Sequence, residues 1–326
     1  MRPPWRVLLP GGGCLRQVPV RRPGSSGPQT TFKELEHTNW ERSAEAYAVG
    51  FGPVTVQTVG ALLQSARAPA PGQRILDVAC GPGFVAESIV ETATERRWLG
   101  GDAVDVVAVD FARSMLEIAE RRLAVTRGAQ AGGASVSFVE ADAESLPFDD
   151  ASVDAVVCNY GVLHLSQPDT FLREAYRCLR PGGWLALSVW APPEETEAFR
   201  LVLESVQVAG NPEVPLPEGP PFFRFGDPAE ARRSLISAGF SPESVECTKV
   251  PQFWEVQDAD ELYQTFLNGT ARSRALLEGQ TPREERAVRR HMQGLLDGIM
   301  EGRPRRELSV PGVVSAGQKQ KQGALL

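Results

Sequence analysis

The chain has 326 residues, of which 42% are hydrophobic and 23% charged, a composition typical of a folded globular protein and not of a disordered or collagen-like one. Its net charge is −7, and because residues 1–30 contain five arginines and no acidic residue, the remainder is more acidic still. Such a body disfavours a nucleic-acid partner. The sequence contains no run of about 18 uncharged apolar residues, so we expect no membrane span.

The five cysteines are far apart in the sequence, and none forms a CxxC pair or lies near a histidine at a metal-site spacing. We therefore predict a reducing compartment, no bound metal and a cytoplasmic location. A mitochondrial or plastid location is the alternative, because the leader, residues 1–31, is rich in arginine and free of acids. Its prolines disfavour the amphipathic helix of a transit peptide, so a disordered extension is also compatible with this segment.

Two segments flank the predicted main fold. Residues 32–72 predict an N-terminal helical cap, since Trp40, Ala44, Tyr47 and Phe51 recur at steps of three and four. At the other end, residues 194–208, 227–238, 259–277 and 282–300 predict helices, and residues 244–251 and 307–316 predict strands. We expect a lid at 210–225, a helical insertion at 258–300 between two antiparallel edge strands, and a tail at 318–326.

Between these segments, short apolar strands alternate with helices. The predicted strands are 74–79, 104–109, 136–139, 153–158 and 184–190, and the predicted helices between them are 84–98, 112–125 and 170–179. Near-continuous apolar strands separated by helices indicate a parallel sheet covered on both faces, which is a doubly wound α/β fold.

Polar residues follow the predicted strands, where ligands of such sheets bind: Asp77, Asp110, Asp142 and Asn159. The turn Cys80-Gly81-Pro82-Gly83 has glycines that let a ligand approach the backbone. Residues 81–86 match the G-x-G-x-x-A pattern of dinucleotide-binding proteins, with Asp110 as a ribose acceptor, so an NAD(P)-binding oxidoreductase is one hypothesis. Asp77 disfavours a pyrophosphate, and with Asp142 it favours a ligand that has a cationic end and an adenosyl end.

Four ordered motifs carry a family resemblance: Leu76–Gly83 (LDVACGPG), Val107–Phe111 (VAVDF), Glu140–Phe148 (EADAESLPF) and Leu179–Gly183 (LRPGG). They resemble the motifs of class I S-adenosylmethionine-dependent methyltransferases, most closely the ubiquinone/menaquinone-biosynthesis-like branch. The resemblance covers residues 40–317 and is most specific at 74–191. It implies a methyltransferase domain at 73–317 with a Rossmann-like sheet of seven mostly parallel strands and an antiparallel edge strand.

The resemblance also implies S-adenosylmethionine as cofactor and assigns its contacts. The methionine moiety would be held by Asp77, Ala79, Gly81 and Gly83, and closed off by Asn159. Asp110 would accept from both ribose hydroxyls, Phe111 and Met115 would flank the adenine, Asp142 and Ala143 would bind its edge, and Tyr47 would lie near the cofactor. Ordering of the turn is the alternative role for Asp77, and core packing for Phe111 and Met115.

His164 follows the fourth predicted strand and resembles a general base of related methylases, with a capping or packing histidine as the alternative. Aromatic residues outside the core predict a small apolar or aromatic acceptor: Trp40, Tyr47, Phe51, Trp190, Phe222, Phe223, Phe225 and Trp254. Packing under long loops is the alternative for these rings. A non-catalytic cofactor-binding regulator is a further hypothesis, and the oligomeric state is not predicted.

Overall fold

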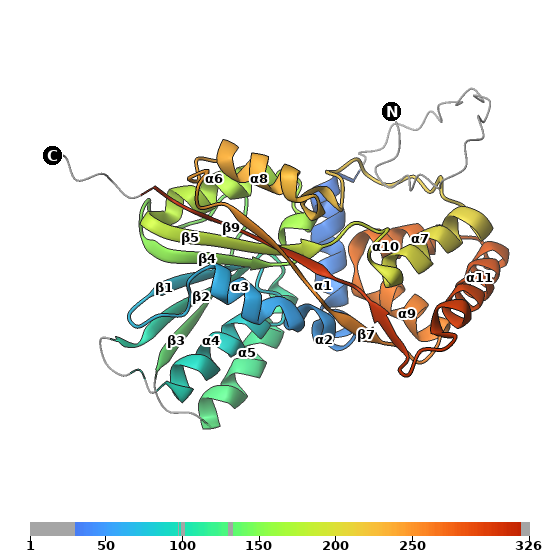
Figure 1. The fold of residues 1–326 in the computed structure, drawn as a ribbon, viewed down its shortest axis with the longest axis horizontal. Coiled ribbons are helices and arrows are strands. Elements are labelled where there is room, and N and C mark those ends of the chain that lie inside the picture. The colour runs from blue at the N-terminus through green and yellow to red at the C-terminus, as the bar shows by residue number, and fades with distance from the viewer. Residues whose placement is uncertain (1–29, 97, 99–101, 130–132, 321–326) are drawn as a thin grey trace.

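The computed structural model describes residues 30–96, 98, 102–129 and 133–320 (Figure 1). The predicted leader, apart from its last two residues, and the end of the predicted tail lie outside this range. Within it, no single helix is long and apolar enough to cross a bilayer, although residues 32–50 and 52–65 pass that test together as a pair bent by 64°.

The centre of the molecule is a seven-stranded sheet in the order β3-β2-β1-β4-β5-β9-β6. Its strands are β1 (Arg74–Val78), β2 (Val104–Asp110), β3 (Ala134–Glu140), β4 (Val153–Asn159), β5 (Leu179–Trp190), β6 (Glu246–Val250) and β9 (Gly312–Gln318). The first five in this order are parallel, and β9 is antiparallel to both of its neighbours. The predicted mostly parallel α/β fold is confirmed, with β9 next to the edge strand β6.

Alternate residues of the central strands belong to different cores because successive side chains point to opposite faces. Ile75 packs with helices α3 (Val59–Ser65), α4 (Phe84–Glu95) and α5 (Arg113–Ala129). Leu76 and Val78 pack on the other face with α6 (Pro168–Cys178) and α8 (Pro228–Ser237). Figure 1 shows these two layers of helices on either side of the sheet. Burial on both faces explains the near-continuous apolar strands.

Helix α1 (Phe32–Gly50) begins at a capping box, in which Thr31 accepts from the Glu34 amide and the Glu34 side chain accepts from Thr31. A short α2 (Gly52–Thr55) and a 3₁₀ turn, η1 (Val56–Thr58), connect it to α3. In Figure 1, α1 lies between the sheet and a group of helices formed by α7 (Glu197–Ala209), α9, α10 and α11. The predicted cap is therefore enclosed on both sides.

The segment between β6 and β9 is helical, as predicted, but its first predicted helix is two helices. It contains β7 (Phe253–Glu255), α9 (Ala259–Gly269), α10 (Ala271–Glu278), α11 (Pro282–Met300) and β8 (Glu307–Ser309). The break lies at Thr270, whose backbone is extended, and it follows Asn268 and Gly269. All three residue types favour helix interiors poorly. Strand β5 also begins earlier than predicted, at Leu179, and includes the Arg180–Gly183 segment.

Candidate functional site

The turn after β1 brings backbone amides to the carboxyl edge of the sheet. Ala79 and Gly81 have φ angles of 53° and 52°, in the left-handed region. The amide of Gly81 donates to Asp110 Oδ2 over 2.9 Å, and the amide of Ala112 donates to Asp110 Oδ1 over 3.0 Å. Asp110 thus fixes the glycine turn and the start of α5 relative to each other.

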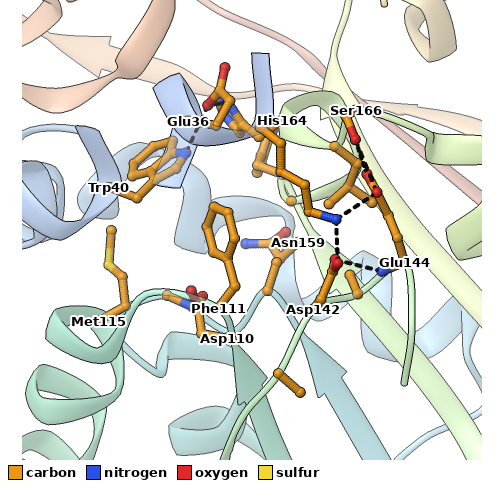
Figure 2. Close-up of a pocket in the computed structure, with 18 of the residues that line it drawn as sticks. Glu36, Trp40, Asp110, Phe111, Met115, Asp142, Glu144, Asn159, His164 and Ser166 are labelled. Carbon is orange, nitrogen blue, oxygen red and sulfur yellow. Dashed lines mark hydrogen bonds and ion pairs between the residues drawn. The ribbon is translucent and has the colours of Figure 1, made fainter. Parts of the chain in front are cut away.

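A cavity of about 710 Å³ opens above this turn (Figure 2). All predicted site residues except Asp77 and Gly83 line it: Tyr47, Ala79, Gly81, Asp110, Phe111, Met115, Asp142, Ala143, Asn159 and His164. We call the lining residues from the ends of β1 to β4, residues 79–143 and Asn159, the floor. We call the lining residues of α1, which are Lys33, Glu36, Trp40 and Tyr47, the roof.

The two exceptions have different physical causes. Asp77 is fully buried behind the turn, and neither of its carboxylate oxygens makes a hydrogen bond within the described residues. Burial raises the pKa of Asp77 to about 7, and the nearby amide of Ala86 opposes that rise only in part. Gly83 packs against α5, where an added Cβ would lie 2.9 Å from Ala119 Cβ. The missing Cβ of Gly83 therefore allows α5 to pack closely, and the contact of Gly83 with the cofactor stays a prediction.

Asp110 is the most buried acid of the floor, with 6% of its surface exposed. Burial raises its pKa to about 6, opposed by the amides of Ala112, Gly81 and Phe111. Each of its oxygens accepts one backbone hydrogen bond and keeps a second lone-pair direction. Asp110 can therefore accept two further hydrogen bonds from a molecule in the cavity.

Asp142 is paired with a residue that the sequence analysis did not identify. The Lys33 ammonium, on the roof helix, forms ion pairs with Asp142 and with Glu144, the latter over 2.9 Å. The other oxygen of Asp142 accepts from the Glu144 amide over 2.9 Å. The ion pair between Lys33 and Asp142 thus connects the roof to the floor at this end of the cavity.

The side chain of Asn159 lines the cavity, but its polar atoms are engaged with the protein. Its Oδ1 accepts from Ser188 Oγ over 2.6 Å and from Thr58 Oγ1 over 2.9 Å, while Nδ2 donates to the Thr55 carbonyl over 3.1 Å. Asn159 therefore fastens the α2–η1 segment to the ends of β4 and β5.

His164 ends a 3₁₀ turn, η3 (Val162–His164), and faces α1. Its Nδ1 lies 3.1 Å from Glu36 Oε2, and its ring packs edge-on against Trp40 at 4.7 Å between centroids. The same Glu36 oxygen accepts from Trp40 Nε1 over 2.9 Å, and Glu36 Oε1 lies 3.4 Å from Arg272 Nε. Sequence reasoning missed Glu36, although an acid among the apolar positions of an amphipathic helix was a usable signal.

The predicted acceptor rings separate into three groups. Trp40 and Tyr47 line the cavity, and burial raises the pKa of the Tyr47 hydroxyl to about 12. Phe222 and Phe223 line a smaller, apolar cavity of about 440 Å³ together with Arg272. The remaining rings, Phe51, Trp190, Phe225 and Trp254, are buried in the main hydrophobic core, so for them packing is the observed role.

The site lies within a segment that known proteins share. Residues 76–187 match a family described as a methyltransferase domain. Among curated proteins, the demethylmenaquinone methyltransferase of Clavibacter sepedonicus is 40% identical over 126 residues, covering 39% of this chain and 44% of that protein. That of Thermus thermophilus is 40% identical over 130 residues, covering 40% of this chain and 52% of that protein. Residues 76–187 of this chain are therefore a methyltransferase domain, and its sequence is similar to that of the two demethylmenaquinone methyltransferases.

The matches to this methyltransferase domain span about half the length of those curated relatives. Two solved structures share its fold, each at 18% identity and a TM-score of 0.50. The match to phosphoethanolamine N-methyltransferase 2 of Haemonchus contortus covers 90% of this chain and 60% of that protein. The match to the [4+2]-cyclase SpnF covers 91% of this chain and 100% of that protein. Since one of these proteins is named as a methyltransferase and the other as a cyclase, this fold alone does not determine the reaction.

The floor fits S-adenosylmethionine, the cofactor that the family resemblance implies, on two observations. A Cβ added at Gly81 would meet no protein atom within 4 Å, so the glycine leaves open space beside the backbone. The lining also contains four carboxylates, those of Glu36, Asp110, Asp142 and Glu144, against one lysine. A ligand with a sulfonium, an amine and two ribose hydroxyls complements such a lining.

Proposed function

We propose that the chain transfers a methyl group from S-adenosylmethionine to a small apolar or aromatic acceptor. The observation that carries this proposal is that one cavity brings together the Gly81 turn, the Asp110 carboxylate and the His164 imidazole under an aromatic roof. The first two suit the cofactor, and the third can accept a proton from an acceptor.

In this proposal the floor binds the cofactor. Asp110 accepts from the ribose hydroxyls, and Ala79 and Gly81 lie along the methionine part, with Tyr47 above them. Phe111 and Met115 flank the adenine, and Asp142 and Ala143 bind its edge. Met115 also packs with Trp40 in a small core between α1 and α5, so its contact with adenine would be one face of a packed side chain.

His164 serves as the base. When bound, the cofactor supplies a methyl group on a positive sulfur, so that the acceptor atom bonds to the methyl carbon as the sulfur–methyl bond breaks and sulfur keeps the electron pair. His164 takes up the proton that an acceptor hydroxyl or acidic carbon loses. The rest of the site aligns the reactants and excludes water, which can supply about 7 to 11 kcal/mol of a barrier.

For the acceptor, we propose a hydroxylated aromatic ring of the quinol type as the first candidate. Two curated relatives are named for demethylmenaquinone, and Trp40 and Tyr47 line the cavity beside His164. The family match covers residues 76–187, so it includes neither α1, which precedes it, nor the helices around the smaller cavity, which follow it. The acceptor therefore has to be tested on this chain itself.

The decisive experiment is a thermal-shift panel of S-adenosylhomocysteine, NADH and NADPH with the full chain. We expect stabilisation by S-adenosylhomocysteine alone, because binding to the native state raises its stability. Stabilisation by a nicotinamide dinucleotide alone would favour the oxidoreductase. A labelled-methyl assay with a reduced naphthoquinone and with cell extract follows, and cofactor binding without methylation of any acceptor would favour the non-catalytic regulator.

The base is tested by His164→Ala. We expect turnover to fall about 10²-fold or more while affinity for S-adenosylhomocysteine changes little, because the imidazole acts on the acceptor. His291→Ala is the control, since His291 lies on α11, does not line the cavity, and has its Nδ1 3.0 Å from Ser205 Oγ. Turnover of His164→Ala close to that of the control would make His164 a packing residue.

A further inference from the structure

Glu36 is an unusually placed acid for a helix that covers a cavity. Its side chain is 1% exposed, and its carboxylate meets three partners from three parts of the chain. These are Trp40 on the same helix, His164 after β4, and Arg272 on α10. A buried carboxylate is costly unless it is paired and hydrogen-bonded, so this arrangement needs a physical account.

Arg272 supplies the balancing charge. Its guanidinium is 12% exposed, donates to the Pro220 carbonyl over 2.8 Å and lies over the ring of Phe32. Burial lowers the pKa of Arg272, and the neighbouring Glu36 opposes that change. With this charge in place, Glu36 requires no contact with His164 for compensation, so the contact with His164 has a separate consequence.

The contact with Glu36 determines which ring nitrogen of neutral His164, Nδ1 or Nε2, carries the hydrogen. Trp40 Nε1 and Arg272 Nε can only donate, so the Glu36 carboxylate accepts from both. A carboxylate oxygen that accepts from Trp40 and also lies 3.1 Å from His164 Nδ1 requires Nδ1 to carry the hydrogen. In neutral His164, Nε2 then keeps its lone pair and is the atom that can take a proton.

We infer that Glu36 is a positioning residue that holds His164 in the tautomer with hydrogen on Nδ1, so that Nε2 is free to act as the base. This inference rests on the proposed function of the same cavity. Among the described residues, the rings of Trp40 and Phe222 pack edge-on with the imidazole, and they offer Nδ1 no acceptor. Glu36 is therefore the group that selects the tautomer, and it also stabilises the imidazolium formed when Nε2 takes a proton.

The test is the tautomer of His164, measured in the full chain with bound S-adenosylhomocysteine by long-range ¹H–¹⁵N NMR of labelled histidine. The chain has three histidines, and the signals lost in His164→Gln identify those of His164. In the wild type above pH 8, we expect a single tautomer with hydrogen on Nδ1. In Glu36→Met, which keeps the length of the side chain and removes the acceptor, we expect the form with hydrogen on Nε2 to appear.

Glu45→Gln is the matched control, because Glu45 lies on the same helix with 75% of its side chain exposed and pairs with Arg121. It should leave the His164 signals unchanged. Arg272→Met tests the charge balance, and we expect it to lower thermal stability while Nδ1 stays protonated.

Two results would overturn the inference: a wild-type His164 with hydrogen on Nε2, which requires no variant to fold, or a Glu36→Met protein that folds and keeps the wild-type tautomer. A fall in melting temperature alone in Glu36→Met, with the tautomer unmoved, would assign Glu36 a purely structural role. Failure of the wild type to bind S-adenosylhomocysteine is a different outcome, because it would contradict the proposed function while leaving the tautomer measurable.

Discussion

The floor and the roof of the cavity are built in different ways. Each floor residue except Met115, which lies in the first turn of α5, lies at or just after the end of a strand, so a short stretch of sequence determines both its position and its direction. The roof is one helix whose side chains meet partners far along the chain, and Glu36 and Arg272 are 236 residues apart. Binding of the proposed cofactor therefore depends on local turns, whereas the environment of the proposed base, His164, depends on tertiary packing.

The largest expected effect is on the floor. Asp110→Ala removes a carboxylate that would accept from two ribose hydroxyls, and hydrogen bonds to a charged group contribute about 1.5 to 3 kcal/mol each. We expect affinity for S-adenosylhomocysteine, measured by calorimetry, to fall at least about 10²-fold. The control is Asp105→Ala on the same strand, whose side chain is 46% exposed and faces Arg74.

The same carboxylate gives the affinity a pH dependence. Burial raises the pKa of Asp110 to about 6, so affinity should decline as the pH falls through 6 and the carboxylate becomes protonated. The Asp110→Ala protein should lack this decline. An affinity for S-adenosylhomocysteine that is unchanged in Asp110→Ala at pH 7 would show that Asp110 does not bind the cofactor. The floor would then not be distinguished from the roof as the cofactor-binding part of the cavity.

The next largest effect concerns the free energy of unfolding and involves Asp77, which is buried behind the glycine turn. Because burial raises the pKa of Asp77 to about 7, the native state holds this proton more tightly than the unfolded state does. The contribution is therefore present below pH 4 and is lost as the pH rises towards 7. Asp77→Asn cannot titrate, so we expect its free energy of unfolding at pH 8 to exceed that of the wild type by about 4 kcal/mol.

Chemical denaturation at pH 5 and pH 8 checks this sign. The difference between Asp77→Asn and wild type should be about twice as large at pH 8 as at pH 5, while Asp105→Asn should follow the wild type at both. A variant that is less stable than wild type at pH 8 would mean that Asp77 is ionised and paired in the native state.

The sequence predicts the floor better than the roof for a physical reason. Asp110, Asp142 and Asn159 each end an apolar strand, and parallel strands place such ends at one edge. Lys33 and Glu36 carry a weaker local mark, because the partners that tie them to the cavity, Glu144 for Lys33 and His164 for Glu36, lie more than 100 residues away. The role of Gly83 was also beyond local reasoning, since only the approach of α5 shows that its missing Cβ serves packing.

The elements follow the same division. The central strands were predicted within a few residues, since burial on both faces makes them continuous apolar runs. The break at Thr270 and the early start of β5 depend on tertiary contacts, which periodicity does not report. Domain limits, site roles and localisation stay predictions.

Substitutions at the two glycines of the turn should change different properties: affinity for the cofactor at Gly81 and stability of the fold at Gly83. At Gly81, φ is 52° and no protein atom lies where a Cβ would be, so Gly81→Ala adds strain of about 1 to 2 kcal/mol and a methyl group beside the cavity. The strain lowers stability in the free and bound protein alike, whereas the methyl group occludes the cavity, and from occlusion we expect about a tenfold loss of affinity for S-adenosylhomocysteine. At Gly83, an added Cβ meets Ala119 at 2.9 Å, so Gly83→Ala should lower the melting temperature more than Gly81→Ala does. Equal stability of the two variants would contradict this division.

The smallest effect lies where roof and floor meet, at Lys33. Its side chain is 42% exposed, and its pairing with Asp142 is the kind of surface ion pair that contributes about 1 kcal/mol or less. If Asp142 accepts from the adenine amine, Lys33 competes for the same carboxylate, and Lys33→Met should raise affinity for S-adenosylhomocysteine by a few fold. Arg121→Met is the control, because it breaks an exposed ion pair between α5 and α1 away from the cavity. Equal affinity in the two variants would mean that Asp142 does not bind adenine, and the cofactor contacts of the floor would then reduce to Asp110 and the glycine turn.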